Sequence, residues 1–204
     1  MTPTVVPFGD RALLVEVAEP DAVAAVRVAL EKAPLPGQRD LVPAARTVLV
    51  VLDRAPTDLD VAALRRLTAG ARVRADRTAV VELEVCFDGA DLDDVAELAG
   101  RSPDDVVRML TTVELTVAFC GFSPGFGYLT GLPGELHVPR RSTPRTRVPA
   151  GSVALAGPYA GVYPQASPGG WQLVGRTDAV LFDADRDPPA LLSPGTAVRF
   201  RIGG

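Results

Sequence analysis

The stretch Leu115-Thr-Val-Ala-Phe-Cys-Gly-Phe-Ser-Pro-Gly-Phe-Gly-Tyr-Leu-Thr-Gly-Leu-Pro-Gly134 determines the architecture of the larger part of this 204-residue chain. Short apolar runs rich in β-forming residues alternate in it with Gly/Pro turns. The same alternation continues downstream, with further turns at Gly157-Pro158, Ser167-Pro-Gly-Gly170 and Ser193-Pro-Gly195. Short strands at this spacing predict a β-barrel or a β-sandwich.

The residues upstream of that stretch predict one more strand and two short helices. Residues 78–87 alternate apolar with acidic side chains, which is typical of a half-buried strand. Asp91 opens the first helix, and Ser102-Pro-Asp-Asp105 opens the second, with serine as the N-cap and proline at the first helical position. The charged, aperiodic residues 71–77 mark a boundary, so we expect an N-terminal domain over residues 1–75 and a barrel domain over 76–204.

The N-terminal part reads as a small α+β domain. Residues 12–17 and 47–52 and the pair Leu41-Val42 predict strands, and residues 20–33 carry apolar side chains at helical spacing. A second helix should start at Thr57 and run to about residue 69, because Thr57 and Asp60 have the spacing of a capping box. The order strand, helix, strands, helix is typical of a two-layer sandwich.

Composition places limits on location and partners. The chain is 47% hydrophobic and 23% charged, with a net charge of -4, which is ordinary for a globular protein and argues against a general nucleic-acid binder. The N-terminus does not resemble a signal peptide, and no segment reads as a membrane span. Cys86 and Cys120 are far apart and form no CxxC pair, so we expect a reduced, cytoplasmic protein.

The most informative local feature is an absence of acids. Residues 136–177 contain no Asp or Glu, yet they carry Arg140, Arg141, Arg145, Arg147 and Arg176. Arginine suits bidentate capture of carboxylate or phosphate, and the glycine-rich turns nearby can add backbone N–H groups. The alternative is that these arginines pair with distant acids, such as those of the segment 183–187.

Residues 119–128 form a second candidate feature, because three phenylalanines and a tyrosine stand among glycines and a proline. Such a loop can surround a small cavity or face a partner. The alternative is an ordinary contribution to the core, and the same choice applies to Trp171.

No complete catalytic device is visible. The only histidine is His137, so a Ser-His-Asp triad lacks its base, and we expect a surface or core role for it. The only lysine, Lys32, lies on a predicted exposed helix face and is a poor base for a Ser/Lys amidase. The few cysteine and histidine residues are scattered, so no metal site is expected, and both cysteines read as inert buried thiols.

Four segments resemble a known family. They are Phe8-Gly-Asp-Arg-Ala-Leu-Leu14, Gly121-Phe-Ser-Pro-Gly-Phe-Gly-Tyr-Leu129, Pro139-Arg-Arg-Ser-Thr-Pro-Arg-Thr-Arg-Val-Pro-Ala-Gly-Ser-Val153 and Gly161-Val-Tyr-Pro-Gln-Ala-Ser-Pro-Gly-Gly-Trp-Gln-Leu-Val-Gly-Arg176. They are similar to the family of allophanate hydrolase subunit 1, which includes the B subunit of 5-oxoprolinase and the sporulation-kinase inhibitor KipI. The resemblance covers essentially the whole chain.

The resemblance implies an α+β fold, with a small N-terminal α+β domain followed by a cyclophilin-like β-barrel domain. It also implies one component of an ATP-dependent, nucleotide-binding hydrolase that opens 5-oxo-L-proline to L-glutamate, with ATP and Mg²⁺ bound in the complex rather than by this chain alone. The implied partners are a companion (allophanate hydrolase subunit 2, or the C subunit of 5-oxoprolinase) and a third component, the A subunit of 5-oxoprolinase.

On this resemblance, Arg145 and Arg147 are the catalytic candidates, because they could stabilise phosphate charge or the substrate carboxylate. The implied substrate-binding residues are Phe122, Tyr128, Arg140, Arg141, Ser167 and Gln172; of these, Tyr128, Ser167 and Gln172 could orient the ring amide. Two alternatives stay open: an allophanate hydrolase component in urea or amide degradation, and a KipI-like inhibitor of a sensor histidine kinase. Allophanate cleavage by this chain alone is not expected, because the amidase lysine is missing.

Overall fold

The computed structural model describes residues 4–68 and 80–203, and the chain divides into two compact units, Met1–Asp76 and Arg77–Gly204. The boundary expected near residue 75 falls among residues 69–79, outside the described residues. Each unit has its own hydrophobic core.

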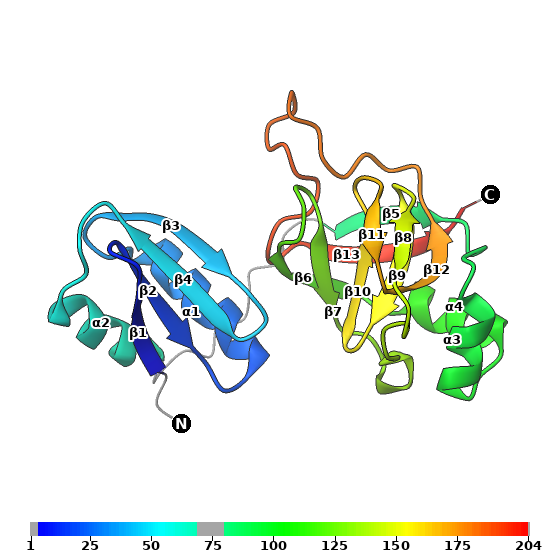
Figure 1. Ribbon diagram of the computed structural model, residues 1–204, viewed down its shortest axis with the longest axis horizontal. Helices are drawn as coiled ribbons and strands as arrows, with labels where there is room; N and C mark the ends of the chain where they lie inside the picture. The colour runs from blue at the N-terminus through cyan, green and yellow to red at the C-terminus, as the bar shows by residue number, and fades with distance from the viewer. Residues whose placement is uncertain (1–3, 69–79, 204) are drawn as a thin grey trace. The chain divides into compact units, whose positions relative to one another are not determined.

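The first unit is one antiparallel sheet, in the strand order β1-β2-β4-β3, packed against two helices (Figure 1). Its elements are β1 (Thr4–Phe8), β2 (Ala12–Glu16), α1 (Pro20–Lys32), β3 (Gln38–Pro43), β4 (Thr47–Leu52) and α2 (Asp58–Thr68). The expected order is confirmed, with one strand added. The β1 strand carries Pro7 and lies at the sheet edge, where a residue without an N–H is tolerated.

The predicted capping box at the start of α2 is confirmed. The Thr57 N–H donates to Asp60 Oδ2 at 2.8 Å, and the Asp60 N–H donates back to Thr57 Oγ1 at 3.4 Å. Arg54 binds both oxygens of the same carboxylate, at 2.8 and 2.9 Å. The hydrogen bond from Arg54 outweighs the opposing effect of burial and holds the pKa of Asp60 far below its usual range.

The second unit is a nearly closed, seven-stranded barrel in the strand order β12-β9-β10-β7-β6-β13-β5. This confirms the predicted cyclophilin-like barrel and with it the α+β class. Its elements are β5 (Val80–Val85), α3 (Leu92–Ala99), α4 (Pro103–Thr112), β6 (Leu115–Cys120), β7 (Gly127–Thr130), the 3-10 turn η1 (Gly134–Leu136), β8 (Arg145–Val148), β9 (Ser152–Ala156), β10 (Tyr159–Val162), β11 (Ser167–Gly169), β12 (Gln172–Arg176) and β13 (Ala197–Ile202).

The segment that follows β5 closes the barrel against β12. Cys86 and Arg176 exchange two backbone hydrogen bonds of 2.8 Å, and the Gly89 N–H donates to the Val174 carbonyl at 3.3 Å. Only glycine fits at position 89, because a Cβ there would lie 2.3 Å from the Val174 carbonyl carbon. This approach brings the residues after Gly89 alongside β12.

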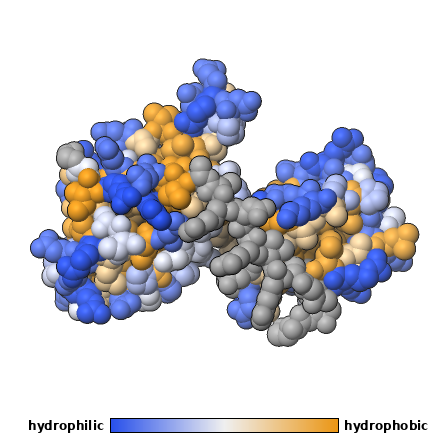
Figure 2. Space-filling view, turned by 180° about the vertical axis from the view of Figure 1, so that it is seen from behind, coloured by the Kyte–Doolittle hydropathy of each residue, from blue (hydrophilic) through white to orange (hydrophobic). Residues whose placement is uncertain are grey.

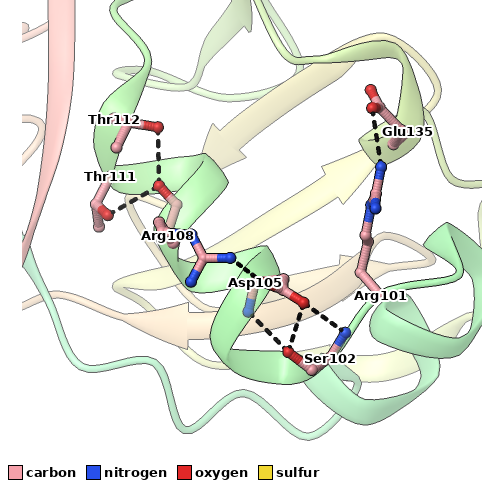
Figure 3. Close-up of polar contacts among 7 residues, drawn as sticks. All are labelled: Arg101, Ser102, Asp105, Arg108, Thr111, Thr112 and Glu135. Carbon is pink, nitrogen blue, oxygen red and sulfur yellow. Dashed lines mark hydrogen bonds and ion pairs between the residues drawn. The ribbon is translucent and has the colours of Figure 1, made fainter.

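Both helices of this unit pack on the barrel, and their starts match the predictions. Figure 3 shows the capping box of α4, in which Ser102 Oγ accepts from the Asp105 N–H at 3.1 Å and Asp105 Oδ2 accepts from the Ser102 N–H at 3.3 Å. Arg108 pairs with the same aspartate. Arg101, at the turn between the helices, pairs with Glu135 of η1 at 3.4 Å (Figure 3). These contacts fix the helix pair whose N-terminal end carries Asp91.

A two-stranded antiparallel sheet, β8-β11, lies beside the barrel and was not predicted. In its register Val148 lies opposite Ser167, and Arg145 lies opposite Gly169. A small apolar cluster involves this sheet: Phe126, Val148, Ala154, Ala156, Tyr163, Trp171 and Leu173. The cluster holds β8 and therefore the position of Arg145.

Candidate functional site

The arginine-rich segment, residues 140–147, runs from an exposed loop into β8. The Arg141 N–H donates to the Gly170 carbonyl at 2.8 Å, so the loop is tied to the turn between β11 and β12. Arg141 and Arg145 turn partly inward, whereas Arg140 and Arg147 are exposed. Neither Arg140 nor Arg147 forms an ion pair with another residue in the described ranges.

Asp91, the N-cap residue of α3, forms ion pairs with both Arg141 and Arg145. Arg141 Nη1 donates to Asp91 Oδ1 at 2.6 Å, and Arg145 Nη2 donates to the same oxygen at 2.7 Å. The Leu173 N–H donates to Asp91 Oδ2 at 2.7 Å. The Asp91 side chain is only 1% exposed, so this carboxylate is used within the fold.

The electrostatics of Asp91 follow from these contacts. Burial by itself would raise its pKa, but the hydrogen bonds from Arg145 and the Leu173 N–H and the charges of both arginines outweigh it. The pKa of Asp91 therefore lies below its usual value. Arg141 and Arg145 carry two positive charges, and Asp91 carries one negative charge. The group of these three side chains therefore has a net positive charge. Asp94 adds only a longer contact, 3.9 Å from Arg141, and its side chain is mostly exposed.

The distant acids proposed as alternative partners do not fill this role. The segment 183–187 projects from the second unit with a hydrophilic tip above a hydrophobic surface (Figure 2). Val180 and Phe182 are exposed at its base, and Arg186 donates to the Val180 and Pro189 carbonyls on either side of the segment. Two of the four arginines of residues 140–147, Arg141 and Arg145, do pair with a distant acid, but that acid is Asp91.

Several buried polar atoms around this group have no hydrogen-bond partner among the described residues. They include Arg141 Nε, Arg145 Nη1, Ser167 Oγ and Gln172 Oε1. Gln172 uses its other side-chain atom, Nε2, to donate to the Pro139 carbonyl at 3.1 Å. Buried polar atoms are normally satisfied, so this concentration of donors and acceptors is typical of a binding site.

An open groove of about 690 Å³ lies between α3 and the arginine-rich segment. Its walls are Asp94, Glu97 and Leu98 on one side and Pro139, Arg140, Arg141 and Ser142 on the other, with Gln172 also lining it. Three of the predicted substrate-binding residues, Arg140, Arg141 and Gln172, therefore share one groove. Arg145 pairs with Asp91 and is not one of the lining residues, and Arg147 is exposed on β8.

The aromatic loop forms a second cluster. Phe126 and Trp171 are buried, with rings 5.5 Å apart and edge to face, and Tyr128 stacks on Phe119 at 4.3 Å. Phe122 is different, because the residue is 61% exposed and its backbone has φ +71°. That conformation strains a non-glycine residue, which is a common property of functional loops. The loop thus supplies core rings and presents one of its aromatic residues at the surface.

Tyr163 links the aromatic cluster to the arginine strand and had no predicted role. A Cβ on Gly169 would lie 2.3 Å from the Tyr163 hydroxyl, so this hydroxyl lies against the residue that pairs with Arg145. Burial raises the pKa of Tyr163, while the charges of Arg140 and Arg145 oppose that effect. Phe122 contacts the Tyr163 ring edge to face at 6.2 Å. The two candidate features therefore meet at Tyr163.

The remaining reactive side chains lie elsewhere or are engaged. Lys32 is exposed on α1, and His137 is exposed with its Nε2 3.2 Å from the Leu132 carbonyl. Both cysteines are half-buried rather than fully buried as predicted. Burial raises the pKa of Cys120, whose thiol donates to the Leu192 carbonyl, and Cys86 Sγ accepts from Arg176 Nη2 at 3.7 Å. Residues 4–68 and 80–203 contain no group of three His, Cys, Asp or Glu side chains that could hold a metal ion.

The described helices include none that is long and apolar enough to cross a bilayer.

Comparison with known proteins identifies the family. The family described as the carboxyltransferase domain, subdomain C and D, matches residues 3–192. The 5-oxoprolinase B subunit of Escherichia coli O157:H7 is 41% identical over 203 residues, covering 95% of this chain and 93% of the relative. The 5-oxoprolinase B subunit of Haemophilus influenzae is 44% identical over 144 residues, covering 69% of this chain and 68% of the relative.

A solved structure has the same fold. The crystal structure of TTHA0988 superposes with a TM-score of 0.78 at 37% identity over 95% of this chain. This chain spans only 40% of the length of TTHA0988. The resemblance drawn from the arginine and aromatic motifs is thereby confirmed: the chain belongs to the carboxyltransferase domain family, subdomain C and D, and within it to the type of the 5-oxoprolinase B subunit and KipI.

Proposed function

We propose that this chain is one component of an ATP-dependent 5-oxoprolinase complex, which converts 5-oxo-L-proline to L-glutamate in the cytoplasm. The observation that carries the proposal is the 41% identity with a 5-oxoprolinase B subunit over nearly the whole of both chains. Likeness of that extent supports a common role rather than a shared domain alone.

The proposed complex contains a companion, the C subunit, and a third component, the A subunit, and the active site forms between this chain and its companion. The naming of the relatives as B subunits supports the presence of companion subunits. ATP and Mg²⁺ would bind in the complex rather than to this chain alone. The phosphates are suitable ligands for arginine, which makes fork-like hydrogen bonds to such oxygens.

The arginine-rich segment is the proposed contribution of this chain to the site. Arg145, whose Nη1 has no partner in residues 4–68 and 80–203, would stabilise phosphate charge or the substrate carboxylate, and Arg147 would meet the part supplied by the companion. Arg140 and Arg141 would hold the substrate in the groove. Charge stabilisation by fixed donors in a site that excludes water is a large source of rate enhancement.

Uncharged groups would orient the ring amide of the substrate. Gln172 Oε1 and Ser167 Oγ are buried and have no partner in the part of the chain that the structure describes, so an amide N–H and a carbonyl oxygen are suitable ligands for them. Tyr128 and Phe122 would form the apolar wall next to the ring. An aromatic surface with a few convergent polar groups is the usual design of a small-molecule site.

The test is ATP turnover by the co-expressed complex, with and without 5-oxo-L-proline and with allophanate as a control. Stimulation by 5-oxo-L-proline that requires this chain supports the proposal. Ammonia release from allophanate without that stimulation would replace it with the urea-linked alternative. Silence with both substrates would leave the kinase-inhibitor alternative in its place.

A further inference from the structure

Asp91 has an arrangement that its place at a helix N-terminus does not explain. An N-cap side chain normally accepts a hydrogen bond from the first turn of its own helix, but the Asp91 side chain makes no such bond. Both of its oxygens turn instead to residues 50 to 82 positions further along the chain. The carboxylate is therefore committed to the arginine-rich segment and to β12.

The backbone around Asp91 is itself anchored. The Asp91 N–H donates to the Leu173 carbonyl at 2.9 Å, and the Leu173 N–H returns a bond to Asp91 Oδ2 at 2.7 Å. The Asp91 carbonyl accepts from the Val95 N–H, which ties the residue to α3. These bonds, together with the bond from the Gly89 N–H to the Val174 carbonyl, fix the position of the Asp91 carboxylate relative to β12.

The positions of Arg141 and Arg145 depend on the Asp91 carboxylate. Their donor atoms Nη1 and Nη2 lie within 2.7 Å of one oxygen, so two positive charges are brought together in a partly buried place. Without the carboxylate they would repel each other and lose their common acceptor. With the carboxylate present, one Nη atom of each guanidinium is hydrogen-bonded to Asp91. Arg141 Nε and Arg145 Nη1 stay without a partner among the described residues.

We infer that Asp91 is the positioning residue of the arginine site. It fixes Arg141 and Arg145 in one arrangement and leaves other donors of both guanidinium groups, Arg141 Nε and Arg145 Nη1 among them, for an anion. The identity of that anion, a carboxylate or a phosphate group, rests on the proposed function, whereas the positioning itself does not.

The test variant is Asp91→Asn. Asparagine has nearly the same shape and can still accept from the Leu173 N–H with its oxygen, so the barrel wall should persist. The side-chain NH₂ group of the asparagine is a donor, so it cannot accept the hydrogen bonds that Arg141 and Arg145 donate. The variant therefore removes the fixing of the arginines while keeping the local backbone.

The readout is the set of arginine Nε–H signals in a ¹H–¹⁵N spectrum of the full chain without partners. In the wild type we expect separate, dispersed signals for Arg141 and Arg145, assigned by their Lys variants. In Asp91→Asn both should move to the position of exposed arginines, with the Val174 amide unchanged. Dispersed signals at their wild-type positions in Asp91→Asn would overturn the inference.

The matched control is Asp60→Asn in the N-terminal unit, where a buried aspartate also binds an arginine, Arg54. That variant should shift the Arg54 signal and leave those of Arg141 and Arg145 in place. If Asp91→Asn does not fold, Arg141→Gln replaces it. The Arg145 signal should then keep its wild-type position, because Asp91 still holds it; its collapse would mean that the arginines hold each other and would overturn the inference.

Activity of the complex gives the second readout. Because misplacement of binding groups by about 1 Å can cost roughly 100-fold in rate, we expect kcat/KM for 5-oxo-L-proline to fall about 10- to 100-fold in Asp91→Asn and to stay within about twofold in Asp60→Asn. An unchanged kcat/KM in Asp91→Asn would overturn the functional part of the inference. A wild-type complex that does not turn over 5-oxo-L-proline would defeat the proposed function alone, since the spectra test Asp91 independently.

Discussion

Replacing Gly89 with alanine should open the barrel where the arginine site is attached. A Cβ at this position would lie 2.3 Å from the Val174 carbonyl carbon, 2.4 Å from the Gly175 nitrogen and 2.4 Å from the Leu173 carbonyl oxygen. All three are backbone atoms, which cannot turn aside as a side chain can. The segment before α3 must therefore move away from β12.

The size of the effect follows from the hydrogen bonds that this movement stretches. Three bonds join the two segments near Gly89: Gly89 N–H to the Val174 carbonyl, Asp91 N–H to the Leu173 carbonyl, and Leu173 N–H to Asp91 Oδ2. At about 1 kcal/mol net each, their loss costs roughly 3 kcal/mol. Alanine returns about 0.4–1 kcal/mol by restricting the unfolded chain. The expected loss in the free energy of unfolding is about 2–3 kcal/mol.

The assay is urea unfolding followed by the fluorescence of Trp171, which is the only tryptophan and is 5% exposed in the second unit. It therefore reports on the barrel and not on the N-terminal unit. Gly134→Ala is the matched control, because nothing lies within 4 Å of a Cβ there, and its midpoint should stay near that of the wild type. Equal midpoints for Gly89→Ala and Gly134→Ala, at equal m-values, would show that the backbone contact at Gly89 does not hold the barrel closed.

Three further predictions use the same unfolding assay. Arg145→Ala should lower activity of the complex, as the family resemblance implies, but should also cost about 1.5–3 kcal/mol of stability, because a charged hydrogen bond to buried Asp91 is lost; a wild-type midpoint would contradict this. Stability of the barrel should be level above about pH 5 and fall as the pH drops below about 4, because the pKa of Asp91 lies below its value in the unfolded chain and its stabilisation is lost on protonation; a decline between about pH 7 and 5 would point to other groups. Phe122→Gly should be more stable than Phe122→Ala by about 1 kcal/mol, since only glycine adopts φ +71° without strain; the reverse order would show that the strain is absent.

The features of the fold that could be predicted are those written in local sequence. The capping boxes at Thr57 and Ser102, the apolar spacing of α1 and the alternation of β5 depend on residues within one turn or one strand. The strand β1 was missed because Pro7 weakens its pattern, and the sheet β8-β11 because its pairing spans about 20 residues of turn-rich sequence. Long-range pairing is decided by packing, which no local pattern records.

Only part of the candidate site could be predicted from the sequence, for the same reason. The acid-free arginine segment and the aromatic loop could be recognised as features, and the structure joins them through Tyr163. The sequence predicts for Asp91 only the start of a helix, because a capping position gives a sufficient local explanation for an aspartate. Its real partners follow it by 50 and 54 residues. Only the closure of the barrel at Gly89 brings them together.

The distance between Asp91 and its arginines also explains why the segment 136–177 can lack acids altogether. Had the segment carried its own carboxylates, each arginine could have paired locally, and the group would have been neutral and flexible. The carboxylate of Asp91, which lies outside this segment and is shared by Arg141 and Arg145, fixes both side chains. It still leaves the group of three side chains with a net positive charge. A site that must attract an anion and still hold its donors in place needs both properties, and the sharing of Asp91 supplies them together.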